Sequence, residues 1–299
     1  MKHRSGKTGD LVFDGIVHLL LIIIGIVTLY PFWNIFVLSF NNALDTIRGG
    51  VYLWPRDFTL LNFKTVMTIE ALPVAFLNSV LRTVIGVITA LLATSMVSYT
   101  ISRKDFIFGK FLQRVFVITM YVSGGLIPYY FVIKNLGLRN NFLVYVIPVL
   151  ISAYYLLIMR SFMDNLPDSI QESAKIDGAN DFQIYYKIVL PLCSPMLAAT
   201  GLFIAVDQWN SWFDSFIFAP KESLTTLQYE LVKVLAQSTA NVANIDEVRQ
   251  KVANGTQMST TPESIRMAIT VVATLPIVLV YPFVQRYFVS GITLGAVKG

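Results

Sequence analysis

The sequence predicts an all-α, polytopic membrane protein with six transmembrane helices. Of its 299 residues, 55% are hydrophobic and only 14% are charged, and the mean hydropathy is +0.62. A soluble domain carries about a quarter charged residues. The apolar residues also form long runs, near the roughly 20 residues that a helix needs to cross a bilayer. Composition and patterning therefore both indicate a chain that folds within a bilayer.

The first span follows a basic N-terminal segment and contains the run Leu19–Tyr30, in which only Gly25 and Thr28 interrupt the apolar residues. The whole stretch from Leu11 to Phe40 is longer than the apolar region of a signal peptide and has no small-residue cleavage site, so we expect it to stay uncleaved. The predicted spans cover residues 12–40, 72–100, 111–133, 142–162, 193–218 and 266–289, in a single membrane domain over 1–299. Internal prolines and glycines such as Pro128 are compatible with membrane helices.

Basic residues favour a cytoplasmic N-terminus and C-terminus. The short loop after the second span holds Arg103, Lys104, Lys110 and Arg114. Several basic residues on the opposite side lie in one long external loop, about 219–265, among acidic residues. Short cytoplasmic loops of membrane proteins are enriched in Lys and Arg, which gives this orientation.

A polar stretch at about 163–190 lies between the fourth and fifth spans and predicts two short helices. Ser169 and Glu172 have the spacing of a capping box at the start of the first. Gly178 is expected to end that helix, because glycine adopts the left-handed backbone of a C-terminal cap. The second helix is expected to begin near Asn180 and run to Pro191. The stretch is either an interfacial loop packed on its own protein or a docking site for a cytoplasmic partner.

Residues in this stretch resemble a known family signature. Glu172-Ser173-Ala174 and Asp177-Gly178-Ala179, followed nine residues after Gly178 by Ile188-x-Leu190-Pro191, resemble the EAA loop of binding-protein-dependent importer permeases. The one departure is Ser173, where the family carries alanine. Serine is also small, so close docking of the helix is expected to survive.

The resemblance extends over nearly the whole chain. It rests on residues in the second span (Asn78, Ser79, Thr83, Ser98, Tyr99, Ser102 and Arg103), in the fifth (Trp209 and Asn210) and near the C-terminus (Gln285–Val289 and Gly295–Gly299). These are similar to carbohydrate permeases and, at the C-terminus, to the membrane subunits of maltose importers. Ser123–Pro128 is similar to a subgroup that handles complex, sometimes acidic, oligosaccharides.

The resemblance implies the fold of a type I ABC importer permease in the bacterial cytoplasmic membrane. It implies a heterodimer with a sister permease, two ATPase subunits underneath, an extracytoplasmic solute-binding protein and an oligosaccharide substrate. ATP and Mg²⁺ would be held by the ATPases, and no cofactor by this chain. The residues implied to couple to an ATPase are Glu172, Ser173, Ala174, Asp177, Gly178, Ala179, Ile188, Leu190 and Pro191, with Gly295 and Lys298 in a C-terminal tail that reaches toward it.

Three charged residues lie inside predicted spans: Arg82, Asp207 and Asp214. Charges inside a membrane are costly and usually face a partner or a cavity. One interpretation is a structural pair between Arg82 and either aspartate. The other is a sugar pathway lined by Arg82, Tyr121, Asp207, Trp209, Asn210 and Trp212, because aromatic rings stack on sugar C–H faces and amides bond hydroxyls.

Other activities find little support in the sequence. Gly6-Lys7-Thr8 lacks the earlier glycine and the strand of a phosphate-binding loop, so we expect no ATP hydrolysis by this chain. We find no catalytic constellation, no metal site and no basic surface for nucleic acid. The alternatives that remain are a secondary transporter, which normally has more spans and inverted repeats, and a membrane enzyme.

Overall fold

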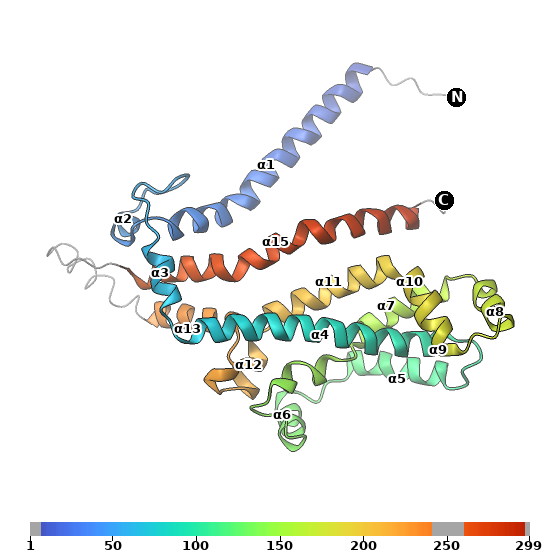
Figure 1. Ribbon diagram of the computed structural model, residues 1–299. Coiled ribbons are helices and arrows are strands. Elements are labelled where there is room, and N and C mark those ends of the chain that lie inside the picture. The colour runs from blue at the N-terminus through green and yellow to red at the C-terminus, as the bar shows by residue number, and fades with distance from the viewer. Residues whose placement is uncertain (1–6, 241–259, 297–299) are drawn as a thin grey trace. The chain divides into compact units, whose positions relative to one another are not determined.

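The computed structural model describes residues 7–240 and 260–296, with side chains described for 11–237 and 260–282. These residues form helices joined by loops (Figure 1), which confirms the predicted all-α class. The only β-bridge among them is an isolated one between Asn41 and Phe58. The chain divides into two compact units, residues 1–69 with 233–274 and residues 70–232 with 275–299.

The first unit begins with the long helix α1 (Lys7–Ser39). It also contains α2 (Ala43–Arg48), α3 (Leu61–Met67), the end of α13 (Leu227–Ala240) and the first part of α15 (Pro262–Ala296). Buried Asn62 of α3 donates hydrogen bonds of 2.9 Å to the carbonyls of Ser39 and Asn41. These bonds satisfy backbone acceptors at the end of α1, which would otherwise be left unpaired.

The second unit is built around α4 (Ala71–Ser102), which packs along α7 and α11 (Figure 1). Its other elements, in chain order, are α5 (Gly109–Tyr121), α6 (Leu126–Asn135), the 3₁₀ turns η1 (Phe142–Tyr145) and η2 (Ile147–Val149), α7 (Ala153–Asp164), α8 (Asp168–Ile176), α9 (Asp181–Ile184), the π-helical turn η3 (Tyr185–Val189), α10 (Leu190–Leu192), α11 (Ser194–Asn210), α12 (Phe213–Phe218) and the 3₁₀ turn η4 (Glu222–Leu224). The start of α13 and the end of α15 also belong to this unit.

Several predicted spans are interrupted helices. The stretch 111–133, predicted as one span, is divided between α5 and α6, and Gly125 between them has a φ of +81°. Similarly, 193–218 is divided between α11 and α12, and 142–162 begins with two 3₁₀ turns before α7. By length and apolar composition, three described helices could cross a membrane, or up to five if each bent pair forms one span. The count of six therefore stays a prediction.

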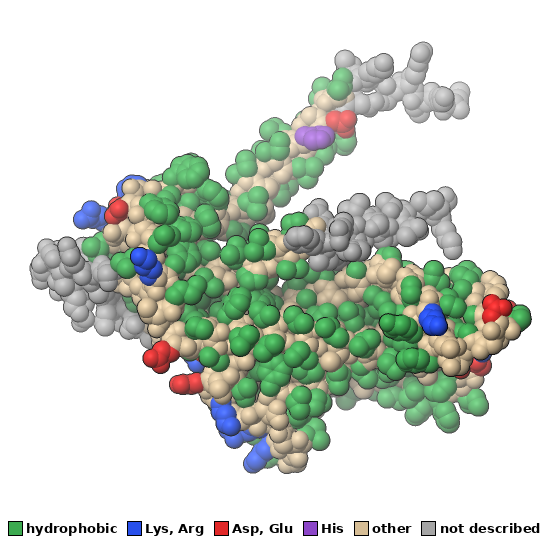
Figure 2. All heavy atoms as spheres, in the orientation of Figure 1, with side chains coloured by type: hydrophobic (Ala, Val, Ile, Leu, Met, Phe, Trp, Pro, Cys, Tyr) green, Lys and Arg blue, Asp and Glu red, His purple; other side chains and the backbone are tan. Residues whose placement is uncertain are grey.

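The surface of the described residues is strongly apolar. No residue of α1 from Leu11 to Phe36 is buried, although this stretch is almost wholly hydrophobic. Figure 2 shows hydrophobic side chains spread over the face in view, with few charged side chains among them. A soluble monomer rarely exposes such a large apolar area, whereas a bilayer solvates it.

Two polar residues near the start of α4, which are among those that carry the family resemblance, bind a segment far away in the sequence. The Asn78 amide donates hydrogen bonds of 2.9 Å to the carbonyls of Ser223 and Thr225, and the Ser79 hydroxyl accepts one from the Leu227 amide. Asn78 and Ser79 are both buried. They fasten the segment that leads into α13 onto α4, and so satisfy backbone groups that lie outside a regular helix.

Two glycines allow α4 and α11 to approach closely. A Cβ added to Gly86 of α4 would lie 2.4 Å from Nε2 of Gln208 on α11. A Cβ added to Gly201 of α11 would lie 3.0 Å from a methyl group of Leu91 on α4. Small residues at helix contacts are typical of membrane proteins, because van der Waals packing replaces the hydrophobic effect there.

We predict that Gly86→Ala destabilises the protein by about 1–3 kcal/mol, because the new methyl group displaces Gln208 from its buried hydrogen bonds. The measurement is the thermal unfolding midpoint in detergent, which should fall. Gly25→Ala on α1 is the matched control, because nothing lies within 4 Å of its added Cβ. An unchanged midpoint in Gly86→Ala would contradict the close contact.

Candidate functional site

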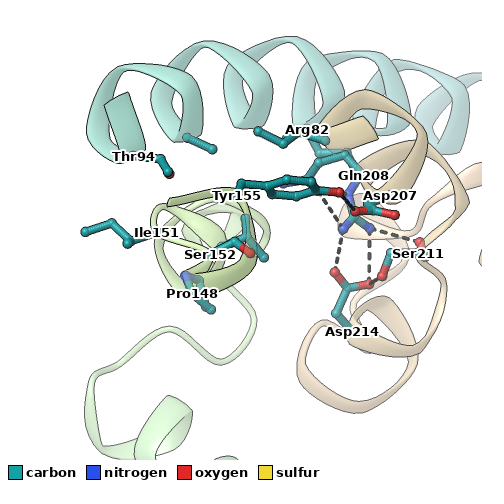
Figure 3. A pocket seen from close by; sticks show the side chains of 13 residues that line it. Arg82, Thr94, Pro148, Ile151, Ser152, Tyr155, Asp207, Gln208, Ser211 and Asp214 are labelled. Atoms are coloured by element: carbon teal, nitrogen blue, oxygen red, sulfur yellow. Dashed lines mark hydrogen bonds and ion pairs between the residues drawn. The ribbon is translucent and has the colours of Figure 1, made fainter. Parts of the chain in front are cut away.

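A pocket of about 330 Å³ lies in the second unit between α4, the η2–α7 segment and the junction of α11 with α12 (Figure 3). Its charged lining residues are Arg82, Asp207 and Asp214, and its uncharged polar lining residues include Gln208 and Tyr155. The structure therefore brings together the three charged residues that the sequence places inside spans.

Arg82 is the most constrained residue of the pocket. Its side chain is 1% exposed, and each of its five N–H groups has an acceptor. Nε and Nη2 donate to Gln208 Oε1 at 3.1 and 2.9 Å. Nη1 donates to the Ser211 carbonyl at 3.0 Å, and Nη1 and Nη2 reach the two carboxylate oxygens of Asp214 at 3.1 and 2.5 Å. The guanidinium carbon also lies 4.5 Å from the centre of the Tyr145 ring.

The break between α11 and α12 creates the acceptors for Arg82. α11 ends at Asn210, and Ser211 is extended, with φ −71° and ψ 122°, so its carbonyl leaves the helical pattern. Asp214 lies in the first turn of α12 and accepts hydrogen bonds from the Ser211 hydroxyl and the Ser215 amide. A carboxylate held in this way is already oriented when the guanidinium binds it on two sides, which is the strongest arrangement of such a pair.

The question of which aspartate pairs with Arg82 is therefore answered. Asp214 forms the ion pair, and Asp207 instead accepts a hydrogen bond of 2.7 Å from the Tyr155 hydroxyl. Because every donor of Arg82 is used, its guanidinium has none left for a ligand. Asp207, which is exposed, keeps acceptor capacity that faces the pocket.

The other predicted pathway residues do not line this pocket. Trp209 is buried, with its ring against Phe76 at a centroid distance of 6.2 Å. Asn210 is exposed and accepts a hydrogen bond from Gln228. Trp212 is 38% exposed and Tyr121 is 84% exposed. Conversely, sequence reasoning missed Tyr155 and Gln208. Gln208 is a polar residue inside an apolar span, which is a signal that could have found it.

The predicted coupling loop, residues 163–190, has the two-helix form that the sequence predicts. Gly178 follows α8 with a φ of +80°, and the Ala179 amide donates to the Ala174 carbonyl at 2.9 Å. This is the glycine-terminated helix end expected there. Asn180 and Gln183 form a reciprocal capping box that starts α9. The second helix then continues through the π-helical turn to Leu192.

The capping box predicted at Ser169 and Glu172 is not formed. The cap position is two residues earlier than predicted: α8 begins at Asp168, and Pro167 occupies the cap position without a side-chain hydrogen bond. Ser169 therefore lies inside the first turn. Proline has no side-chain acceptor, so the first backbone amides of α8 receive no side-chain cap from this position.

The residues with a predicted coupling role lie on two faces. Glu172, Ser173, Asp177, Gly178 and Pro191 are exposed. Ala174 is buried in the chain's own core, where Ala179, Ile188 and Leu190 also pack. This differs from the interpretation in which Ala174 faces a partner: its small side chain lets α8 approach Ile184 and Met163 of the same core. Gly295 lies within α15, and Lys298 lies outside the described residues.

The described residues contain no group of three or more His, Cys, Asp or Glu side chains that could hold a metal ion. The single cysteine, Cys193, is buried in the core beneath the coupling loop.

We predict that Arg82→Met destabilises the protein by about 3–5 kcal/mol, because it leaves Asp214 without its ion pair. Adding Asp214→Leu should recover a large part of this loss, since the double variant has no uncompensated charge. Unfolding in detergent measures both variants. Equal losses in the single and double variants would contradict a structural pair.

Comparison with known proteins gives the family. The model of the family described as "Binding-protein-dependent transport system inner membrane component" matches residues 5–294. The chain is 34% identical over 288 residues to the polygalacturonan/rhamnogalacturonan transport system permease protein YtcP of Bacillus subtilis, covering 96% of this chain and 99% of that protein. It is 27% identical to the arabinooligosaccharides transport system permease protein AraQ of Halalkalibacterium halodurans, covering 92% and 93% of the two chains.

A solved structure agrees with this result. A bacterial ABC transporter involved in the import of the acidic polysaccharide alginate contains a chain with a TM-score of 0.82 and 28% identity, covering 96% of this chain and 99% of that one. The fold is therefore that of a type I ABC importer permease, as the resemblance implied. ATP hydrolysis belongs to separate ATPase subunits. The chain belongs to the family of binding-protein-dependent transport system inner membrane components, as a multi-pass transport subunit and not an enzyme.

Proposed function

We propose that this chain is one of two different permease subunits of an ATP-driven importer that moves an oligosaccharide across the bacterial cytoplasmic membrane. The observation that carries the proposal is a single helical unit that holds both a polar pocket and an exposed coupling loop. Two ATPase subunits, which hold ATP and Mg²⁺, dock on the cytoplasmic side, and a solute-binding protein delivers the sugar outside. Both termini are cytoplasmic.

A carbohydrate is supported from two sides. Relatives are named for polygalacturonan, rhamnogalacturonan and arabinooligosaccharide transport, and the solved homologue for alginate import. The pocket presents the Asp207 carboxylate and the Tyr155 ring, which suit the hydroxyls and C–H faces of a sugar. A secondary transporter is not favoured, because an exposed coupling loop has no role in one.

The pocket is better suited to bind the hydroxyl groups of a sugar than its carboxylate groups. Of its three charged residues, Arg82 and Asp214 neutralise each other, which leaves Asp207 as the remaining charge. A carboxylate on the sugar would be repelled here. If the oligosaccharide is acidic, its carboxylates are therefore bound by the sister subunit or the solute-binding protein.

The exposed face of the coupling loop suits an ATPase surface. Ile176 at the end of α8 is 86% exposed, and Phe182 and Tyr186 of the following helical turns are also exposed. Glu172 and Asp177 add negative charge to the same loop. Apolar side chains with a charged rim are the usual composition of a protein–protein contact.

We predict that Asp207→Ala lowers uptake at limiting sugar concentration by about 10-fold or more, because it removes a charge-assisted hydrogen bond of about 1.5–3 kcal/mol. Uptake by the importer in proteoliposomes is the measurement. Tyr154→Phe is the control, since Tyr154 is exposed and does not line the pocket. If Asp207→Ala takes up sugar at the wild-type rate, this pocket is not part of the sugar pathway.

We also predict that Gly178→Asp and Glu172→Lys abolish sugar-coupled ATP hydrolysis while membrane insertion stays intact. At Gly178 the left-handed backbone costs a side-chain residue about 1–2 kcal/mol, so the end of α8 is displaced. Co-purification of the ATPase and sugar-stimulated hydrolysis are the readouts. Glu70→Lys is the matched control, because Glu70 is an exposed glutamate at the N-terminal end of α4, whereas the coupling loop contacts the C-terminal end. Normal coupling in both loop variants would count against the docking role.

A further inference from the structure

Arg103, the residue that follows α4, lies at the centre of a charged cluster. Its side chain is 13% exposed. Nε and Nη2 donate to the two oxygens of Asp105 at 3.2 and 3.0 Å, and Nη1 donates to Gln171 of α8. Nη2 also lies 3.6 Å from a carboxylate oxygen of Asp181, the first residue of α9. One arginine at the end of α4 therefore contacts both helices of the coupling loop.

The two residues after Arg103 add further contacts to α8. Lys104 pairs with Asp168 at the start of α8, and Asp105 pairs with Lys175 near its end at 3.1 Å. The Arg103 hydrogen bonds, and then that of Lys175, hold the pKa of Asp105 far below its ordinary value. Because the folded-state pKa is lowered, this stabilisation is present above the ordinary pKa and is lost only as the pH falls through the lowered value. The cluster is therefore intact at neutral pH.

A buried contact lies behind the charged cluster. The Tyr185 hydroxyl of η3 is 2.8 Å from the Ser95 hydroxyl of α4, and its ring lies 5.4 Å from that of Tyr99. The Tyr99 ring in turn lies 5.7 Å from the guanidinium carbon of Arg103. The C-terminal end of α4 is thus held to the coupling loop by the charged cluster around Arg103 and by the buried contacts of Tyr185.

α4 is a continuous helix from this cluster to the pocket. It runs from Ala71 to Ser102, and its only proline, Pro73, lies in the first turn. Arg82 and Arg103 are 21 positions apart, which is about 30 Å along a helix. An unbroken helix of this length transmits a displacement of one end to the other better than a jointed one.

We propose that Arg103 is a positioning residue that fastens the coupling loop to α4, so that the two move as one body and α4 carries a displacement of α8 to the pocket. The proposal rests on the proposed function, in which an ATPase docks on α8. The helix that transmits the displacement is then α4, although α7 and α11 are the helices directly connected to the coupling loop in the sequence. The alternative is a loop that slides over the end of α4 during each cycle.

A reversible crosslink tests the proposal in the assembled importer. Lys104→Cys and Asp168→Cys are combined in a Cys193→Ala background, joined by a short cleavable bis-thiosulfonate, and assayed in proteoliposomes with the solute-binding protein. Mass spectrometry measures how complete the crosslink is. If loop and helix move together, crosslinked and uncrosslinked samples take up sugar equally. Loss of uptake that is recovered on reduction would overturn the proposal.

A second experiment uses the variant Arg103→Gln. This variant should transport about 10-fold less sugar per ATP hydrolysed, and the crosslink between residues 104 and 168 should restore this ratio of sugar to ATP. Arg103→Lys should be intermediate, because a lysine cannot bind a carboxylate with two parallel N–H groups. Arg114→Gln, at an exposed arginine of α5, is the control.

The outcomes separate the two proposals. A wild-type ratio in Arg103→Gln, or a lowered ratio that the crosslink does not restore, overturns the role of Arg103 while leaving ATP-driven import in place. Absence of any ATP-dependent uptake by the unmodified importer overturns the proposed function, and the role of Arg103 with it.

Discussion

A buried guanidinium must have all its N–H groups paired, and this requirement at Arg82 organises the second unit. The five donors take acceptors from Gln208, Ser211 and Asp214, while Tyr145 covers the face of the group. These acceptors come from the end of α11, from the break after it and from α12. Removing a charge from water costs several kcal/mol unless such partners are supplied, so the break and the charge depend on each other.

Arg82 in turn allows the non-helical backbone after α11 to lie inside an apolar protein. The freed Ser211 carbonyl would be costly in hydrocarbon, but Arg82 binds it. Gln208 connects Arg82 to a second segment, because its Oε1 accepts a hydrogen bond from Arg82 while its Nε2 donates one to the Tyr145 carbonyl at 3.0 Å. Gly86 leaves the space in which this amide lies. A glycine, an amide and a helix break thus form one arrangement around one charge.

The same break explains why the sequence could not decide the partner of Arg82. Asp207 and Asp214 are seven residues apart, so a continuous helix would place both on one face and make them nearly equivalent. Because α11 ends at Asn210, Asp214 turns toward Arg82 and Asp207 is left to Tyr155. A helix break at Ser211 has no proline or glycine to mark it, unlike the break that Gly125 marks between α5 and α6.

The coupling loop was easier to predict because its signals are local. Gly178 ends a helix through its own backbone freedom, and Asn180 starts the next one through a cap with Gln183, three residues further on, so neighbouring residues are sufficient for both predictions. Which face of α8 is buried depends instead on Met163 and Ile184, which approach from other helices. Apolar composition likewise predicted helices, but not where tertiary contacts would interrupt them. Long-range contacts of this kind leave no local pattern.

The two walls of the pocket are held to α4 by bonds of unequal strength. The α11–α12 wall is joined through the buried ion pair of Arg82, whose disruption costs about 3–5 kcal/mol. The α7 side is joined through single neutral hydrogen bonds, from Thr94 to the Leu150 carbonyl and from Ser98 to the Leu156 carbonyl, each worth about 1 kcal/mol. α4 is therefore held to the α11–α12 wall by a charged contact and to the α7 side by neutral ones, and the Tyr155–Asp207 hydrogen bond joins the two walls to each other.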